Sequence, residues 1–512
     1  MTESKLRNHK WLPLLTVCLG TFMLLVDVTV VNVALPDMAV DLGASFTALQ
    51  WVIDVYAIVL AALLLGAGAL ADRHGHRVVY VGGLLLFALS SLCSGLAPGT
   101  TELIVARGFQ GAGAAAMFAT TISLINASYS GRDRGIAFGV WGGVNGAAAA
   151  AGPIVGGILT EAISWRWIFF INLPVSVAAV ALAFAVLPRA PGRSGGRIDL
   201  PGIAAFTVSA GALTYALTRA PAVGWTAAST LGLLGLALFA ALAFVVVQLR
   251  GANPIIELGL LRRPAFSGTM IGALLLAVAA FGAMPFLSLW LQSVRGMSPI
   301  EAGLALAPLS LAAFVTALAL GRVLHRVRPQ LPIAIGLALV GSGALLQAHL
   351  GTGSDWTSLA PGLAVAGIGV GLVSPTLASA ALASVPLERS GMAAGAVNTM
   401  RQLGFALGIA VLGAIAQAQI GAELGSEGAA ASGDLAEKLI GGQSQAVLAS
   451  AGSGRAALDQ AIHASFASGL NAALLVAGAI GLGGAALTAV LLRPRTARVD
   501  DERPELAADP AT

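Results

Sequence analysis

The sequence predicts an all-α integral membrane protein with fourteen transmembrane helices. Three observations support this: the composition is very apolar, long apolar runs recur along the chain, and basic residues are concentrated in alternate loops. Hydrophobic residues make up 57% of the 512 positions and charged residues only 10%, whereas soluble domains carry about 25% charged residues. A single globular core could not bury so much apolar surface, so we expect lipid to surround most of the chain.

The apolar runs have the length of membrane-crossing helices, which need about 20 mainly apolar residues. The fourteen predicted spans are 11–35, 47–71, 78–97, 102–127, 135–160, 167–188, 200–219, 228–249, 265–291, 300–321, 331–350, 358–384, 391–420 and 464–492. Glycine and proline occur inside several of them, which membrane helices tolerate better than soluble helices do.

The distribution of basic residues predicts the orientation. With the N-terminus in the cytoplasm, 21 of the 28 Lys and Arg residues fall in cytoplasmic loops and tails, as expected for short loops on that side. An even number of spans places both termini in the cytoplasm. The excess of arginine over lysine, 25 to 3, is typical of a GC-rich bacterial genome, so the predicted location is the bacterial inner membrane.

The order of the spans predicts two six-helix bundles joined by a two-helix insert. The loop at 321–328 repeats part of the pattern at 68–77, and such an echo is expected of transporters built by duplication. The predicted parts are an N-terminal bundle at 1–188, a linker and two-helix insert at 189–263, a C-terminal bundle at 264–492 and a cytoplasmic tail at 493–512. A short interfacial helix is expected within 250–264, and a long outer loop at 421–463.

Four charged residues lie inside predicted spans: Asp27, Asp54, Arg107 and Arg401. A charge at the bilayer centre costs about 2.5–3.5 kcal/mol, so it normally has a function and a partner. Counting residues from the outer ends of the spans places both aspartates roughly 10–12 Å deep and Arg107 roughly 8 Å deep. The similar depths predict a proton-and-cation site in the outer part of the first half. A purely structural role, tying helices together, stays open for each residue.

Arg401 lies near the predicted midplane of the thirteenth span. It could line a substrate cavity or hold helices together. A separate pattern of small residues marks the fifth span, at Gly152, Pro153, Gly156 and Gly157. Proline bends a helix, and glycines allow helices to approach closely. Small residues also pack membrane helices in general, so this pattern alone does not assign a function.

Taken together, seven stretches resemble the major facilitator superfamily, in particular its fourteen-spanner drug:proton antiporters. The stretches are residues 26–36, 50–56, 68–77, 107–113, 152–157, 165–174 and 401–404. The resemblance covers nearly the whole chain and implies the major facilitator fold.

The resemblance also implies roles for single residues. Gly68, Asp72, Arg73, Gly75 and Arg77 match the superfamily's loop motif, in which the aspartate and its arginines form an inner gate. The glycine–proline pattern of the fifth span marks exporters. Asp27 and Asp54 match positions implicated in proton coupling or cation recognition. The chain lacks the extra carboxylates that some multidrug members carry in spans ten and thirteen, which favours monocationic or neutral amphipathic substrates.

The predicted function is therefore proton-coupled antiport of drugs or antibiotics by alternating access. The expected partners are an amphipathic small molecule, protons and the lipid bilayer, and the expected state is a monomer without cofactor or metal. A proton-coupled nutrient or metabolite importer is the alternative. An enzyme is disfavoured because no histidine pairs with a catalytic partner at a suitable spacing, and the net charge of +4 argues against nucleic-acid binding.

Overall fold

The computed structural model describes most of the chain as α-helix. The residues it describes are 9–44, 46–189, 199–251, 254, 256, 258–324, 327–386, 389–426, 432–440, 444, 447–448 and 455–493. Within these residues there is no β-strand.

The first six predicted spans form seven helices. They are α2 (Leu12–Asp41), α3 (Phe46–His74), α4 (His76–Gly95), α5 (Thr100–Ser128), α6 (Gly131–Ala162), α7 (Trp167–Phe170) and α8 (Asn172–Val186). The predicted insert forms α9 (Leu200–Val223) and α10 (Ala228–Arg250). Spans one to eight thus each coincide with a helix, the sixth being divided into α7 and α8 at Ile171.

The last six spans follow the same pattern. They correspond to α12 (Pro264–Phe281) with α13 (Met284–Leu289) and the π-helix η1 (Trp290–Val294), then α14 (Pro299–Leu324), α15 (Gln330–Gln347), α16 (Ala360–Ala383), α17 (Ser390–Ser426) and α20 (Arg455–Leu491). The ninth span is interrupted after Phe281, and the helix that follows begins at Met284 with Pro285 in its first turn.

Thirteen described segments are long and apolar enough to cross a membrane. They include every predicted span except the fifth, which corresponds to α6. That helix has 32 residues and packs against α2 and α14. The prediction of an all-helical membrane protein is confirmed.

Both halves contact each other through close helix packing. On α6, a Cβ atom added to Gly139 would lie 2.4 Å from the carbonyl oxygen of Ala317 on α14. On α17, the side-chain amide of Asn398 donates a hydrogen bond of 2.9 Å to the carbonyl of Phe118 on α5. These contacts lie toward the helix ends that the predicted topology places at the cytoplasm, so the halves are joined on that side.

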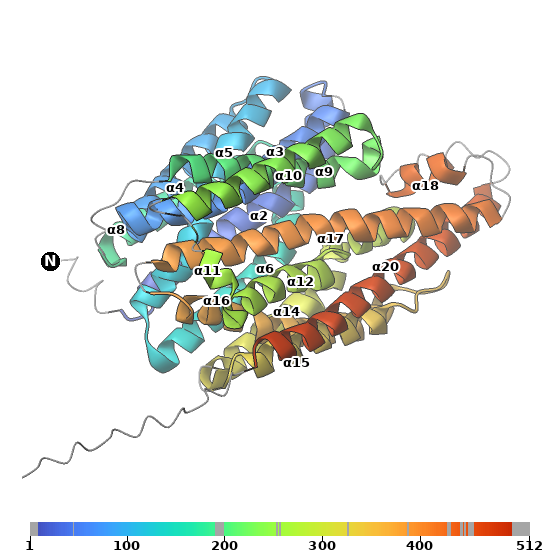
Figure 1. Cartoon of the computed structure of the whole chain (residues 1–512). Coiled ribbons are helices and arrows are strands. Elements are labelled where there is room, and N and C mark those ends of the chain that lie inside the picture. Colours follow the sequence, from blue (N-terminus) through green and yellow to red (C-terminus); the bar gives the residue numbers. More distant parts are fainter. Residues whose placement is uncertain are drawn as a thin grey trace, which may run out of the picture.

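The two helices of the insert differ in their surroundings. Figure 1 shows α9 and α10 between the blue N-terminal helices and the orange α17, and α9 packs against both α3 and α17. Trp51 of α3 and Tyr215 of α9 pack against each other with ring centroids 5.0 Å apart. By contrast, α10 exposes large apolar side chains such as Leu238 and Phe239. We therefore assign α9 to the protein interior and α10 to the lipid-facing surface.

The helices next to the predicted outer loop are longer than their apolar runs. The predicted loop began at 421 and ended at 463, but α17 continues to Ser426 and α20 begins at Arg455. A short helix, α18 (Ser432–Ile440), follows α17 in the chain and packs beside its end (Figure 1). The added turns contain Ala, Leu and Glu, which favour helix outside the apolar region too.

Other predicted connections are only partly within the described residues. The linker residues 190–198, the tail residues 494–512 and positions 325–326 of the repeated loop lie outside them. Of the expected interfacial helix at 250–264, the described part contains the short helix α11 (Leu258–Leu261).

Candidate functional site

A buried ion pair joins α2 and α5. Asp27 and Arg107 are each 1% exposed, and Nη1 of Arg107 donates to Oδ2 of Asp27. The sequence placed these two residues at similar depth in the same half, and the structure brings them into direct contact.

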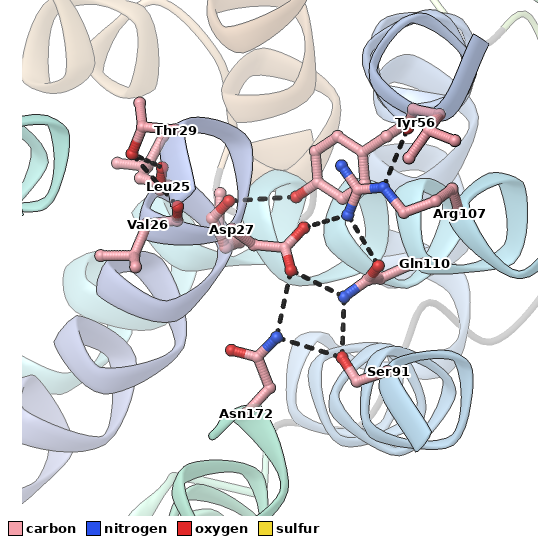
Figure 2. A network of polar contacts seen from close by, with 11 residues as sticks. Leu25, Val26, Asp27, Thr29, Tyr56, Ser91, Arg107, Gln110 and Asn172 are labelled. Atoms are coloured by element: carbon pink, nitrogen blue, oxygen red, sulfur yellow. Dashed lines mark hydrogen bonds and ion pairs between the residues drawn. The ribbon is translucent and has the colours of Figure 1, made fainter. Parts of the chain in front are cut away.

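Three further polar side chains complete the site, which we call the Asp27 network (Asp27, Ser91, Arg107, Gln110 and Asn172; Figure 2). Oδ1 of Asp27 accepts hydrogen bonds from Nε2 of Gln110 at 2.9 Å and from Nδ2 of Asn172 at 3.1 Å. Both amides also donate to Oγ of Ser91, at 2.7 and 3.2 Å. The network therefore draws on α2, α4, α5 and α8 and lies inside the N-terminal bundle.

The guanidinium of Arg107 is enclosed on its other sides. Its Nε donates to the carbonyl of Val52 at 3.0 Å and its Nη1 to Oε1 of Gln110 at 2.7 Å. The ring centroid of Tyr56 lies 4.3 Å from its Cζ atom, and that of Phe169 lies 5.8 Å away. Such cation–π contacts strengthen when water is excluded.

The geometry of the network fits an ionised aspartate. All three side chains that contact the Asp27 carboxylate are donors, and an ionised carboxylate accepts without donating. A buried charge needs both a counter-charge and hydrogen bonds, because desolvation alone costs several kcal/mol per ion. Because the carboxylate is buried, Asp27 can exchange a proton with water only if the surrounding helices move.

The other two predicted intramembrane charges do not join the network. Asp54 is half-buried on α3, three residues after Trp51, and the charge that acts on it belongs to Arg219 of α9. Arg219 is the last residue of the predicted span 200–219, and the structure includes it in the last turns of α9. Arg401 is half-buried on α17 and forms no hydrogen bond or ion pair with a described residue.

The gate segment, residues 68–77, contacts the start of α17. Oδ1 of Asp72 accepts the backbone N–H of Gly391 at 2.7 Å, and Oδ2 accepts that of Met392 at 2.8 Å. A negative charge is favoured at a helix N-terminus, where backbone N–H groups are unpaired. A Cβ atom on Gly68 would lie 2.4 Å from the carbonyl oxygen of Gly391, so the glycine is required for this approach.

The remaining gate residues shape the turn between α3 and α4. Gly75 has φ of 93°, a conformation that favours glycine. Arg77 donates to the carbonyls of Phe184 at 2.7 Å and Leu187 at 3.1 Å, at the end of α8. Arg73 lies in the last turn of α3. The segment thus joins α3, α8 and α17 at one end of the molecule.

The glycines of the fifth span pack α6 against two neighbours. An added Cβ at Gly152 would lie 1.7 Å from Oγ1 of Thr29 on α2. One at Gly157 would lie 3.8 Å from the Ile300 side chain of α14. Gly156 is buried, and the helical assignment of α6 continues through Pro153. The pattern therefore places α6 between the two halves.

Replacing Asp72 with asparagine is expected to slow transport without loss of membrane insertion. The amide keeps one acceptor but loses the charge that interacts with the helix terminus, an effect of about 0.3–1 kcal/mol at exposed sites and up to about 2 when partly buried. The corresponding loss in transport rate is about 2- to 30-fold. Transport by equal amounts of purified protein in proteoliposomes measures it, and a wild-type rate would exclude a gating role.

Sequence reasoning missed Asn172 and Ser91 as members of the site. Each is a single uncharged polar residue in an apolar helix, which carries little signal by itself. The signal that could have found Asn172 is its position in the stretch 165–174, which the sequence singled out without a role.

Comparison with known proteins identifies the family. The family model described as the Major Facilitator Superfamily matches residues 17–409, which is more than three quarters of the chain. The chain belongs to the Major Facilitator Superfamily. It is therefore a multi-pass membrane transporter of small molecules and not an enzyme. No cluster of potential metal ligands occurs in the part of the chain that the structure describes.

Several curated proteins that are similar to this chain are bacterial. The tetracenomycin C resistance and export protein of Streptomyces glaucescens is 34% identical over 99% of this chain and 96% of its own length. The puromycin resistance protein pur8 of Streptomyces alboniger is 35% identical over 82% of this chain and 84% of its own. The cephamycin export protein CmcT of Amycolatopsis lactamdurans is 36% identical over 78% of this chain and 83% of its own.

A solved structure of the superfamily has the same fold. The human organic anion transporter MFSD10 superimposes with a TM-score of 0.62, covering 95% of this chain and 100% of that one at 16% identity. At this identity the likeness concerns the fold alone. The major facilitator fold predicted from the sequence is confirmed.

Proposed function

We propose that this transporter exports antibiotics or drugs in exchange for protons by alternating access. The curated relatives are named for antibiotic resistance and export, which supports export as the direction. The observation that supports proton coupling is the buried Asp27 network. A titratable carboxylate inside a membrane helix costs free energy, so it is expected to have a function. Asp54, half-buried near Arg219, is the second candidate for the proton site.

The proposed substrates are monocationic or neutral amphipaths. Asp27 is paired with Arg107. The positive charge of Arg219 acts on Asp54, so both carboxylates are less favourable to a dication. The proposed setting is the bacterial inner membrane, with both termini in the cytoplasm and the gate segment on that side. The proton gradient supplies the energy, so no cofactor is required.

The energy available sets what coupling can achieve. One proton that enters down about 100 mV gains about 2.3 kcal/mol, and one unit of pH gradient adds about 1.4 kcal/mol. The sum supports a several-hundred-fold gradient of a neutral drug at one proton per drug. A monocation exchanged for one proton moves no net charge, so only the pH gradient drives its export.

The test uses inside-out membrane vesicles with an acidic interior and ethidium as the monocationic probe. We expect ethidium to accumulate inside, and nigericin, which removes the pH gradient, to abolish the accumulation. Valinomycin with potassium, which removes the voltage, is expected to leave it unchanged. Accumulation that survives loss of both gradients would refute proton coupling. If vesicles with an acidic interior release a preloaded tracer and do not accumulate ethidium, the result would favour the nutrient importer.

A further inference from the structure

The segment 165–172 connects the outer end of α6 to the start of α8, and it carries contacts at both of its ends. It contains α7 and ends at Asn172, the first residue of α8. Trp165 is 3% exposed and Asn172 is also 3% exposed. The two ends of this segment contact the same helix, α2, at two different carboxylates.

At the inner end, Asn172 binds the Asp27 network. Its Nδ2 atom reaches Oδ1 of Asp27 at 3.1 Å and Oγ of Ser91 at 3.2 Å, as Figure 2 shows. Phe169, one helical turn earlier, lies over the guanidinium of Arg107. The segment therefore contacts both members of the buried ion pair.

At the outer end, the segment binds Asp41, the last residue of α2. Nε1 of Trp165 donates to Oδ2 of Asp41 at 3.0 Å, and Nη1 of Arg166 pairs with the same oxygen. Arg166 lies over the Trp165 ring at 4.4 Å. The hydrogen bonds from Arg166 and Trp165 lower the pKa of Asp41 below its usual value of 3.8, so this contact stays charged at neutral pH.

The two contacts restrain the rotation of α2 and its movement along its own axis. Asp27 and Asp41 are fourteen residues apart on this helix, which corresponds to roughly 21 Å along its axis. A helix held at two such separated points cannot turn Asp27 away from Arg107 without breaking one of them.

We infer that Asn172 is a positioning residue that holds the ionised Asp27 carboxylate against Arg107, and that segment 165–172 fastens α2 for this purpose. The inference rests on the proposed function, in which Asp27 binds and releases the exchanged proton. Among the described residues, the charged or titratable groups that face Asp27 are Arg107 of α5 and Tyr56 of α3, whose hydroxyl donates to the Leu24 carbonyl at 3.1 Å. Asn172 is the contribution of α8 and carries no charge of its own.

Loss of the Asn172 amide leaves Oδ1 of Asp27 with Gln110 as its one remaining donor in the network. A hydrogen bond to a charged group contributes enough to move a titration by about one to two pH units. The ionised form loses this bond, so the variant takes up its proton at higher pH than the wild type.

The experiment is pH-difference infrared spectroscopy of the full chain in proteoliposomes. The carboxyl C=O band of protonated Asp27 is assigned by its loss in Asp27→Asn. We expect Asn172→Leu to move the midpoint of this band upward by about one to two pH units. The serine of Asn172→Ser is smaller and cannot reach the carboxylate, so this variant is expected to shift the midpoint in the same direction. It replaces Asn172→Leu in the experiment if the leucine variant does not fold.

Two matched controls separate positioning from general destabilisation. Asn471→Leu removes an amide that bonds the backbone of Leu350 at 2.8 and 2.9 Å in the other half. Asp355→Asn removes an exposed carboxylate of the other half, whose pKa the Thr357 side chain holds below its usual value. Neither is expected to move the midpoint as far as Asn172→Leu does.

The inference is overturned if the midpoint of the Asp27 band is unchanged in both Asn172 variants. It is also overturned if Asn471→Leu shifts that midpoint as far as Asn172→Leu does. The inference is also overturned if the C=O band of protonated Asp27 is absent at every pH in both the wild type and Asn172→Leu. Because the spectra need no drug, this readout is independent of export. Failure of the proposed function shows separately, as absence of drug-driven proton exchange in the wild type.

Discussion

Replacing Arg107 with leucine is expected to destabilise the folded protein by about 3–5 kcal/mol, the usual cost of removing one partner of a buried ion pair. The variant leaves the Asp27 carboxylate, 1% exposed, without its counter-charge. It also removes the donors to Val52 and Gln110. Thermal unfolding of the purified protein in detergent measures the effect, and transport is expected to be lost.

A double variant tests whether the cost comes from the uncompensated charge. Asp27→Asn combined with Arg107→Leu is expected to recover most of the lost stability, because no buried charge remains. Arg134→Leu is the matched control, since Arg134 is exposed and donates to Asn126 at 2.7 Å near the end of α5. If Arg107→Leu and Arg134→Leu shift the unfolding temperature equally, the ion pair does not stabilise the bundle.

Replacing Gly68 with valine is expected to abolish transport while the protein still inserts in the membrane. The new Cβ would lie 2.4 Å from the carbonyl oxygen of Gly391, which is backbone and cannot move aside. The halves then cannot close at this end, and the hydrogen bonds from Gly391 and Met392 to Asp72 cannot form. Proteoliposome transport, together with cysteine cross-linking between the ends of α3 and α17, measures both effects.

Gly82→Val provides the control for this prediction. Gly82 lies in α4 with nothing within 4 Å of an added Cβ, so the same change should leave transport near the wild-type rate. Retained transport and cross-linking in Gly68→Val would contradict a requirement for the close approach of α3 and α17.

The similar depth of Asp27 and Arg107 could be predicted because both lie inside apolar runs. Depth follows from residue counts, since the rise of a helix is constant. The direction in which a side chain points depends on how the helices pack, which counting does not give. Asp54 illustrates this: its depth matches that of Asp27, yet it lies near Arg219 of α9 rather than in the Asp27 network.

The position of the insert could not be predicted for the same reason. The apolar runs predict two more helices between the halves, but they do not predict which helices pack beside them. In the structure α9 fills the space beside α3 and α17, with a Cβ at Gly66 reaching 3.0 Å from Ile203. The uncharged members of the site, Asn172 and Ser91, were missed because hydrogen-bond partners from four helices meet only in the folded protein.

The central claim is that Asp27 carries the proton that is exchanged for drug. The most direct measurement is ethidium-driven proton release from proteoliposomes, with the voltage held at zero by valinomycin and potassium. We expect release by the wild type and by the control Asp355→Asn, which changes an exposed carboxylate of the other half. We expect none by Asp27→Asn, because an amide cannot release a proton. Proton exchange by Asp27→Asn at the wild-type rate would contradict the claim and make Asp54 the leading candidate.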